Sequence, residues 1–248
     1  MKIAVCVSNV PDTATKIKIS AGGKEIDKTG VSFIVNPYDE FAIEEAVRTK
    51  EKSGGETVVI SAGVDSNKEI MRKALAMGID SGVLLKTSEQ LDSNAVATLL
   101  AEEIKSGGYD IVFMGKQSVD YDSSVTGQLT AAKAGYNCVT VCVSLNIENG
   151  AIIAEREIEG GREVIKSALP AVITAQKGLN DPRYPNLKGI MDAKRKPLVE
   201  KPVTPPVPLV EVIEMSLPAP KAAGRIVGTD ASAVPELVRL LREEAKVI

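Results

Sequence analysis

The feature that most constrains the fold is a repeated alternation of short apolar runs and helical patterns along the first half of the chain. Strands are predicted over residues 2–7, 57–61, 82–85 and 110–114, and helices over 37–53, 66–77, 92–105 and 128–134. Strands that alternate with helices pair in parallel through right-handed crossovers. The sequence therefore predicts an α/β fold with a doubly wound, mostly parallel sheet of the Rossmann-like type.

The helix over residues 37–53 has the clearest start signal. Asn36 is a favoured N-cap residue, Pro37 fits the first helical position, and Asp39 stands three residues after the cap. Between the first strand and this helix, residues 16–19 and 24–26 predict a short ribbon that leads away from the core.

The stretch from Gly115 to Gly127 follows a strand and leads into a helix. Ser123, Ser124 and Thr126 add hydroxyl donors to the free N–H groups at a helix start. Ligands of open α/β sheets lie outside the carboxyl ends of the strands. The stretch therefore suits an anionic group such as phosphate, while an ordinary loop with a serine N-cap explains the same residues.

Other ligand-binding motifs do not fit this stretch or the rest of the chain. An EF-hand that began at Asp120 would need Gly and Glu where Val125 and Ala131 stand. Neither a P-loop nor a G-x-G-x-x-G motif occurs in the chain. The pyrophosphate fingerprints of kinases and of Rossmann dehydrogenases are therefore missing.

After Gly135 the pattern changes to antiparallel strands. Strands are predicted over residues 138–145, 151–158 and 163–167, joined by Asn149-Gly150 and Gly160-Gly161, which favour hairpin turns. A buried strand follows over residues 170–175. We expect these residues to add an antiparallel hairpin to the sheet.

The C-terminal region has the pattern of an extended arm that ends in a helix. Five prolines from Pro197 to Pro208 indicate an extended chain that cannot form a central strand. Residues 232–245 predict an amphipathic helix. We therefore divide the chain into an α/β domain, 1–196, and an arm, 197–248, that packs on a partner subunit or, alternatively, on its own domain.

Composition excludes several classes of function. The 248 residues contain no histidine, which excludes histidine-based hydrolase chemistry and most zinc sites. A formal charge of −3 and an aromatic content of 3% argue against a nucleic-acid partner. Cys6, Cys138 and Cys142 form no C-x-x-C motif and are expected to be small unpaired residues in the core or near the site.

The sequence shows no pattern of a signal peptide and no apolar run of membrane-spanning length. We therefore expect a cytoplasmic or organelle-matrix protein that does not insert into a membrane.

Five stretches together resemble the β subunit of electron transfer flavoproteins. They are Ile3–Val7 with Val10-Pro11-Asp12; Val35–Ala46; Ala74–Asp80; Gly115–Gln128; and Arg156–Gly161 with Asp181–Tyr184 and Gly189–Met191. The resemblance covers residues 1–198 and continues weakly in the C-terminal helix. It implies a heterodimeric electron carrier, not an enzyme, that takes electrons from acyl-CoA dehydrogenases to a membrane quinone oxidoreductase. The α subunit would hold most of the FAD, and the β subunit would bury an AMP.

The resemblance also implies which residues contact the cofactors. The adenosine of AMP would meet Cys6, Asn36 and the Ser61-Ala62-Gly63 turn. Its phosphate would meet Ser118, Tyr121, Ser124, Val125 and Thr126, in a loop that also contains the expected contacts Gly115, Gln117 and Asp120. Tyr38 and the Pro11-Asp12-Thr13 loop would approach the flavin, although Thr13 replaces a second aromatic residue of the family.

Two alternatives remain beside the AMP-binding reading. One is a bifurcating flavoprotein, which oxidises NADH and holds a second FAD in the β cleft. In that group the position of Thr126 is commonly Val and the stretch Asp181–Tyr184 differs, so these two features favour AMP. The other alternative is a stand-alone adenine-nucleotide-binding protein, which would be a stable monomer without flavin.

Residues 184–196 match the recognition loop of the family, in which Leu187 would anchor in a pocket of the dehydrogenase. A solvated basic face explains the same composition. Asp192 stands where animal members carry a methylated lysine. The expected docking residues are Tyr184, Leu187, Lys188, Ile190, Met191, Lys194 and Arg195, with Arg183 and Lys196 as further cations.

Glu157 matches a carboxylate that is thought to pair with an α-subunit arginine when the flavin domain moves. An ordinary charge on a strand explains the same residue.

Overall fold

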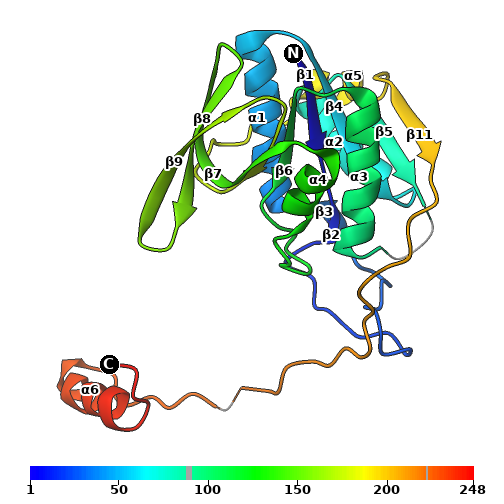
Figure 1. Ribbon diagram of the computed structural model, residues 1–248. Helices are drawn as coiled ribbons and strands as arrows, with labels where there is room; N and C mark the ends of the chain where they lie inside the picture. The colour runs from blue at the N-terminus through cyan, green and yellow to red at the C-terminus, as the bar shows by residue number, and fades with distance from the viewer. Residues whose placement is uncertain (88–90, 222) are drawn as a thin grey trace.

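The computed structural model describes residues 1–87, 91–221 and 223–248. Within them a sheet has the strand order β11-β5-β4-β1-β6-β10-β7-β8-β9 and is covered by helices on both faces (Figure 1). Its strands are β1 (Lys2–Cys6), β4 (Glu56–Gly63), β5 (Ser81–Lys86), β6 (Ile111–Gly115), β7 (Asn137–Glu148), β8 (Ala151–Ile158), β9 (Gly161–Ala168), β10 (Ala171–Ala175) and β11 (Leu198–Pro202). The helices are α1 (Pro37–Ser53), α2 (Asn67–Met77), α3 (Ser93–Gly107), α4 (Thr126–Ala134), α5 (Leu187–Ala193) and α6 (Val234–Glu243).

The pairing confirms the predicted doubly wound sheet with an added hairpin. All neighbours from β11 to β7 pair in parallel, and β8 and β9 continue the sheet in antiparallel fashion. Strand β7 is longer than predicted because its first part pairs with β10 and its second part pairs with β8.

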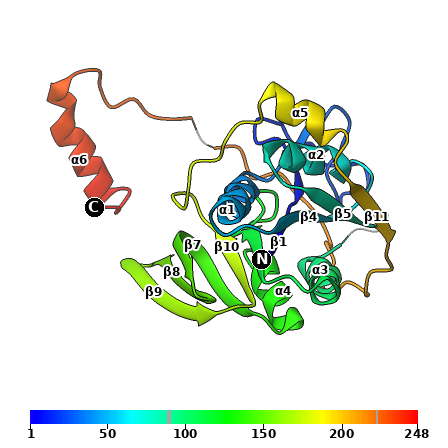
Figure 2. The ribbon, with the colours of Figure 1, turned by 90° about the horizontal axis from the view of Figure 1, so that it is seen from above.

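Two apolar cores lie on the two faces of the sheet. Ile3 and Val5 pack in one core with residues of α1 and α2, whereas Ala4 and Cys6 pack in the other with residues of α3 and α4. Figure 2 shows α1, α2 and α5 on one side of the sheet and α3 and α4 on the other. Because side chains alternate between the faces of a strand, the uninterrupted apolar run of β1 is what a central parallel strand requires.

The predicted ribbon over residues 16–26 was largely wrong. One antiparallel bridge joins Ile19 and Ile26, and a small two-stranded sheet forms instead between β2 (Asn9–Pro11) and β3 (Phe33–Val35). Ile17, Ile19 and Ile26 lie outside both apolar cores of the described residues, so no core packing holds a longer two-stranded ladder together.

The proline-rich segment is extended, as predicted, and its first part forms the edge strand β11 beside β5. Proline is tolerated at an edge, where its missing N–H removes no ladder bond. The sheet therefore continues past residue 196, while the division of the chain into two units stays a prediction.

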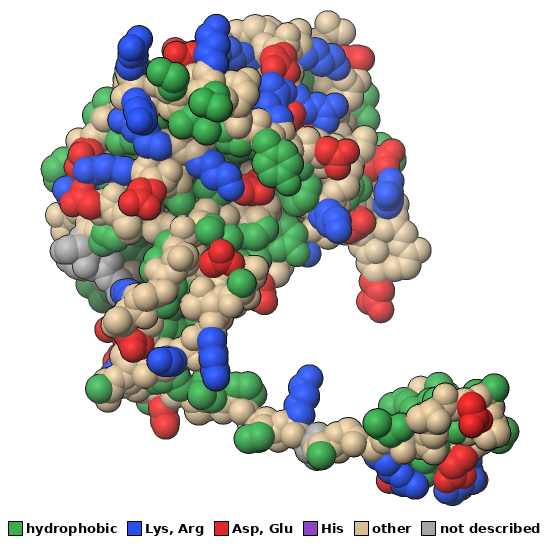
Figure 3. All heavy atoms as spheres, turned by 180° about the vertical axis from the view of Figure 1, so that it is seen from behind, with side chains coloured by type: hydrophobic (Ala, Val, Ile, Leu, Met, Phe, Trp, Pro, Cys, Tyr) green, Lys and Arg blue, Asp and Glu red, His purple; other side chains and the backbone are tan. Residues whose placement is uncertain are grey.

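Beyond β11 the arm makes further contacts with the body, the first of them the hydrogen bond from the N–H of Val203 to the Lys86 carbonyl. The N–H groups of Leu209 and Val210 donate to Asp92, the N-cap residue of α3. The N–H of Met215 donates to Gly23, and Lys24 forms an ion pair with Glu211. Beyond Met215 the arm and α6 stand clear of the body (Figure 3), and no residue of α6 is buried.

Candidate nucleotide site and docking surface

The carboxyl ends of β4, β1 and β6 lie side by side at the centre of the sheet. The chain winds from β1 outward through β4 to β5, and then returns to place β6 on the other side of β1. This reversal of direction is the switch point at which open α/β sheets bind ligands. Cys6, Ser61, Gly63 and Gly115, all predicted to lie near the cofactor, are therefore brought to one edge.

The buried carboxylate of Asp39 joins several segments at this edge. Its Oδ2 accepts the N–H of Ser8 at 2.7 Å, and its Oδ1 accepts the N–H of Gly115 at 3.0 Å and Nδ2 of Asn36 at 2.9 Å. A Cβ added at Gly115 would collide with Oδ1, so glycine is needed there for the close approach. Burial raises the pKa of Asp39 to about 7, although these hydrogen bonds act in the opposite direction.

Asn36 lies at the N-cap position of α1, as predicted, but its side chain makes no capping bond. Instead Nδ2 donates to the carbonyl of Gln117 at 2.9 Å, and Oδ1 accepts the N–H of Val119 at 3.1 Å. The fully buried amide of Asn36 therefore holds the loop that follows β6.

The loop from Lys116 to Val125 is held by its own polar groups as well. The N–H of Lys116 donates to Ala175 of β10, and the Ser124 hydroxyl donates back to the Lys116 carbonyl at 3.2 Å. Gln117 Nε2 donates to Asp122 at 2.6 Å. Asp122 and Ser124 both have positive φ angles, of 50° and 51°, which indicates a tightly folded loop.

Helix α4 begins at the end of this loop without a side-chain cap. It starts at Thr126, two residues earlier than predicted, and its N-cap residue Val125 makes no side-chain bond. The first N–H groups of a helix have no partner within the helix. The Thr126 hydroxyl likewise has no hydrogen bond in the described part of the chain, so this helix start offers a set of unused donors.

The other predicted contacts are a buried residue of β1, an aromatic residue beside the loop, and residues of the loop itself. Cys6 is buried, and burial raises the pKa of its thiol far above the usual range, so the thiol is neutral. Lys116 Nζ lies 5.0 Å from the centre of the Tyr38 ring, close to the loop. Ser118 is partly buried, Asp120 and Tyr121 are exposed, and the Asp120 carboxylate accepts the Tyr121 N–H.

Asn67, in the first turn of α2, is a residue of this edge that the sequence did not predict. Its Nδ2 donates to the Ser61 hydroxyl at 2.9 Å and to the Ala62 carbonyl at 3.4 Å, and a Cβ at Gly63 would collide with it. The sequence signal that could have identified this residue is an asparagine at the start of a helix that closely follows a strand. Asn67 thus fixes the Ser61-Ala62-Gly63 turn through hydrogen bonds from α2.

The predicted docking segment projects its apolar residues into solvent. Asn186 caps α5, accepting the N–H of Gly189 at 2.8 Å, and Leu187 is 78% exposed. Tyr184, Ile190 and Met191 are exposed as well. The exposed cations beside them are Lys188, Lys194 and Arg195.

Two cations that the sequence placed around Leu187 bind the body instead. The Arg183 guanidinium donates to Glu44 at 2.8 and 3.0 Å and to Glu51 at 2.6 and 3.0 Å, both on α1. Lys196 Nζ donates to the carbonyls of Leu75 and Ile79 at the end of α2. These bonds fix the two ends of the docking segment, so neither side chain adds a free charge to its surface.

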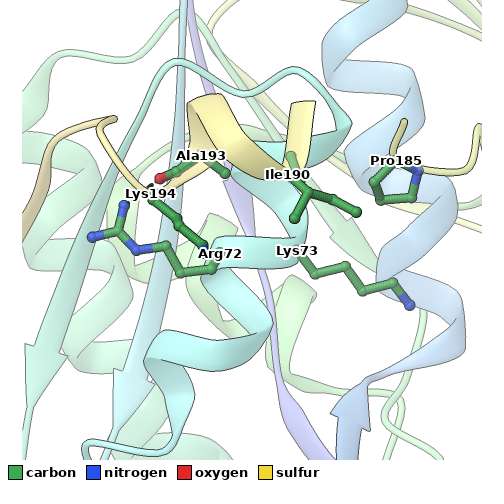
Figure 4. A pocket seen from close by; sticks show the side chains of 7 residues that line it. Arg72, Lys73, Pro185, Ile190, Ala193 and Lys194 are labelled. Carbon is green, nitrogen blue, oxygen red and sulfur yellow. Dashed lines mark hydrogen bonds between the residues drawn. The ribbon is translucent and has the colours of Figure 1, made fainter. Parts of the chain in front are cut away.

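A groove of about 560 Å³ lies between α2 and α5. Figure 4 shows Arg72 and Lys73 of α2 on one side and Ile190 of α5 on the other, with Pro185 at one end. Arg72 donates to the carbonyls of Ala193 and Lys196, and Lys73 pairs with Glu40. The groove therefore adjoins the predicted docking segment, while its cations bind α5 and α1.

Glu157 is exposed on β8 and accepts a hydrogen bond of 2.9 Å from Gln176. Its role in domain motion stays a prediction. Among the described residues there is no cluster of three or more metal-ligating side chains, and no helix is long and apolar enough to cross a membrane.

Comparisons with known proteins identify the family to which the chain is similar. A family model described as the electron transfer flavoprotein domain matches residues 24–206. The chain is 39% identical over 259 residues to the electron transfer flavoprotein subunit beta of Bacillus subtilis, and all of both chains is covered. It is 37% identical over 251 residues to the protein of that name from Homo sapiens, with 98% of each chain covered.

Proposed function

Since the chain belongs to the electron transfer flavoprotein β-subunit family, we propose that it binds a structural AMP and assembles with an α subunit that holds most of a redox-active FAD. The β chain performs no bond chemistry of its own. The complex carries electrons from acyl-CoA dehydrogenases to a membrane quinone oxidoreductase, and the FAD supplies the redox chemistry.

The observation that carries the AMP proposal is the uncapped start of α4 at the switch point of the sheet. Within the described residues, the amide groups after Val125 and the hydroxyl of Thr126 are donors without side-chain partners, and a helix start favours an anion. A terminal phosphate fits this donor set. Ser118 and Tyr121 lie in the same loop and complete the proposed phosphate contacts.

The adenosine would lie against the ends of β1 and β4. Cys6 is a neutral, buried group there, and Asn67 fixes the Ser61-Ala62-Gly63 turn. These features give the base and the ribose a preformed wall. Tyr38 and the Pro11-Asp12-Thr13 loop, which begins at the end of β2, would approach the FAD.

Docking to the dehydrogenase would use the exposed segment of α5. Leu187 stands free at the start of that helix, and Arg183 holds the preceding chain on α1. A preformed apolar anchor loses little conformational entropy on binding. The cations Lys188, Lys194 and Arg195 would steer an acidic partner surface towards it.

The test is to co-express the chain with its α subunit, purify the complex, denature it and count the nucleotides released. We expect one FAD and one AMP per heterodimer. Two FAD and no AMP would establish the bifurcating alternative, with a second flavin in the β cleft. A chain that purifies alone, without flavin, would establish a separate nucleotide-binding protein.

A further inference from the structure

The carboxylate of Asp39 lies at the crossing of three segments and has no direct access to a ligand. Only 4% of the residue is exposed. Its two oxygens are occupied by the N–H groups of Ser8 and Gly115 and by Nδ2 of Asn36. Asp39 therefore joins the end of β1, the end of β6 and the start of α1.

Burial of this carboxylate lowers the stability of the folded state. No Lys or Arg forms an ion pair with it in the described part of the chain, and a buried charge without a counter-charge is unfavourable. Burial is also the largest influence on its pKa. An apolar side chain has no acceptor and an amide has one oxygen, whereas the Asp39 carboxylate has two oxygens and both accept from N–H donors.

The link continues from Asp39 into the nucleotide loop through Asn36. The Asn36 amide has one orientation that satisfies all its partners, because Nδ2 donates to Asp39 and to the Gln117 carbonyl, while Oδ1 accepts from Val119. An acceptor at Asp39 thus fixes which end of the amide faces the loop. The position of Gly115 is set directly, and those of Gln117 and Val119 are set through Asn36.

We propose that Asp39 is a positioning residue for the nucleotide: its carboxylate orients Asn36 and holds Gly115, so that the loop before α4 presents its backbone donors to the phosphate. Asp39 itself does not touch the nucleotide. This inference rests on the proposed function, because it takes the β cleft as the AMP site.

Asp80 offers a matched control for a general loss of stability. Its carboxylate accepts the N–H and the hydroxyl of Thr57 at 2.9 Å and pairs with Lys50. It lies just before β5, at the amino edge of the sheet, whereas Asp39 lies at the carboxyl edge. Asp80→Asn therefore makes the same chemical change away from the nucleotide.

The experiment compares purified α–β complexes that contain the wild-type chain, Asp39→Asn or Asp80→Asn. The amide introduced by Asp39→Asn would place an N–H₂ group against the N–H of Ser8 or Gly115, or turn the Asn36 amide. We expect AMP to dissociate about tenfold faster from Asp39→Asn, since one buried donor loses its acceptor. The rate for Asp80→Asn should equal that of the wild type even if its melting temperature falls. Equal AMP dissociation from wild type and Asp39→Asn would overturn the proposal, as would equal acceleration by both variants.

Amide hydrogen exchange on the same complexes gives a readout that does not depend on AMP. We expect Asp39→Asn to accelerate exchange at Ser8, Gly115 and Val119. Asn36→Ala should accelerate exchange at Val119 but leave Gly115 protected, since Asp39 still accepts its N–H. Unchanged exchange at Gly115 and Val119 in Asp39→Asn would overturn the proposal.

The two readouts separate this inference from the proposed function. A wild-type complex that releases no AMP would refute the AMP site, and the exchange pattern would then decide whether Asp39 orders the loop. A complex that holds AMP but shows no response to Asp39→Asn would refute the positioning role alone.

Discussion

At the scale of single residues, the hydroxyl groups of Thr126 and Thr130, one turn apart on α4, differ in their hydrogen bonding. The Thr130 hydroxyl donates to the Thr126 carbonyl at 2.8 Å, so it is satisfied within the helix. The Thr126 hydroxyl has no such bond in the described chain and lies at the helix start. The two residues therefore make opposite predictions for the same substitution.

Thr126→Val should weaken AMP retention by about 1–2 kcal/mol, the effect of losing one buried hydrogen bond. The measurement is the AMP dissociation rate from the purified complex. Thr130→Val is the matched control, and it should leave this rate unchanged while lowering the melting temperature slightly. Equal losses in the two variants would assign the effect to the helix and not to the phosphate.

Asn36 marks the limit of what local sequence predicts at this scale. Its position before Pro37 identified the start of α1, and that start is confirmed. Its side-chain partners Gln117 and Val119 are more than eighty residues away. Local propensity carries no information about such contacts, because they arise only when the carboxyl ends of β1 and β6 meet.

At the scale of elements, Asp80 connects the turn after α2 to β4 and α1. Burial alone would raise the pKa of Asp80, but hydrogen bonds from Lys50 and Thr57 outweigh it and hold the pKa below its usual value. A carboxyl with a lowered pKa stabilises the folded state above its unfolded pKa, and this contribution is lost as the pH falls through the folded pKa.

Asp80→Asn should therefore lower the melting temperature at neutral pH and flatten the loss of stability below about pH 4, relative to the wild type. Circular dichroism melting curves of the complex from about pH 3 to about pH 7 measure both effects. Parallel curves for the two proteins would show that Asp80 does not contribute to acid unfolding.

The docking segment makes a second prediction about an element. Leu187→Ala should slow electron uptake from the dehydrogenase about tenfold or more, because it removes the apolar anchor, while the bound flavin stays unchanged. Stopped-flow reduction of the complex measures this rate. Val164→Ala, a change at another exposed apolar residue, on β9, is the control. Unchanged kinetics in Leu187→Ala would remove α5 from the docking model.

Arg183→Ala tests whether the ion pairs of Arg183 with Glu44 and Glu51 of α1 are needed for docking. Without its bonds to Glu44 and Glu51, the chain before Leu187 loses its fixed position. We expect a smaller decrease in the rate of electron uptake than for Leu187→Ala, a few-fold, because the anchor is present but less ordered. The same stopped-flow reduction checks it, and a rate equal to that of wild type would show that these ion pairs are not needed.

At the scale of the whole molecule, the sequence predicted the body better than its extensions. The alternation of strands and helices identified the sheet and its helical layers, because each element shows its own period and burial. The edge strand β11 was not predicted, since prolines in Leu198–Pro202 and beyond argue against central strands but do not identify an edge. The partner of α6 cannot be deduced from this chain, whose described residues leave that helix uncovered.

Removal of residues 229–248 should leave the body folded, because among the described residues the hydrogen bonds between the body and the arm end at Met215 and no residue of α6 is buried. Assembly with the α subunit should weaken about tenfold or more, since an amphipathic helix loses its partner surface. Sedimentation of the mixed subunits measures assembly, and the circular dichroism of the truncated chain checks its fold. Undiminished assembly would mean that α6 packs elsewhere.

The pairing of β11 with β5 also affects how the arm resists mechanical tension. It lies parallel to β5 over five residue pairs, Leu198 to Pro202, and the arm continues from its carboxyl end (Figure 1). Tension along the arm would first reach the hydrogen bonds of Met215, Val210 and Leu209 with the body. Once those have broken, the tension acts along β11 as shear, and the ladder bonds resist it together. A partner that moves while bound to α6 would extend the arm beyond Met215 before it separated β11 from β5.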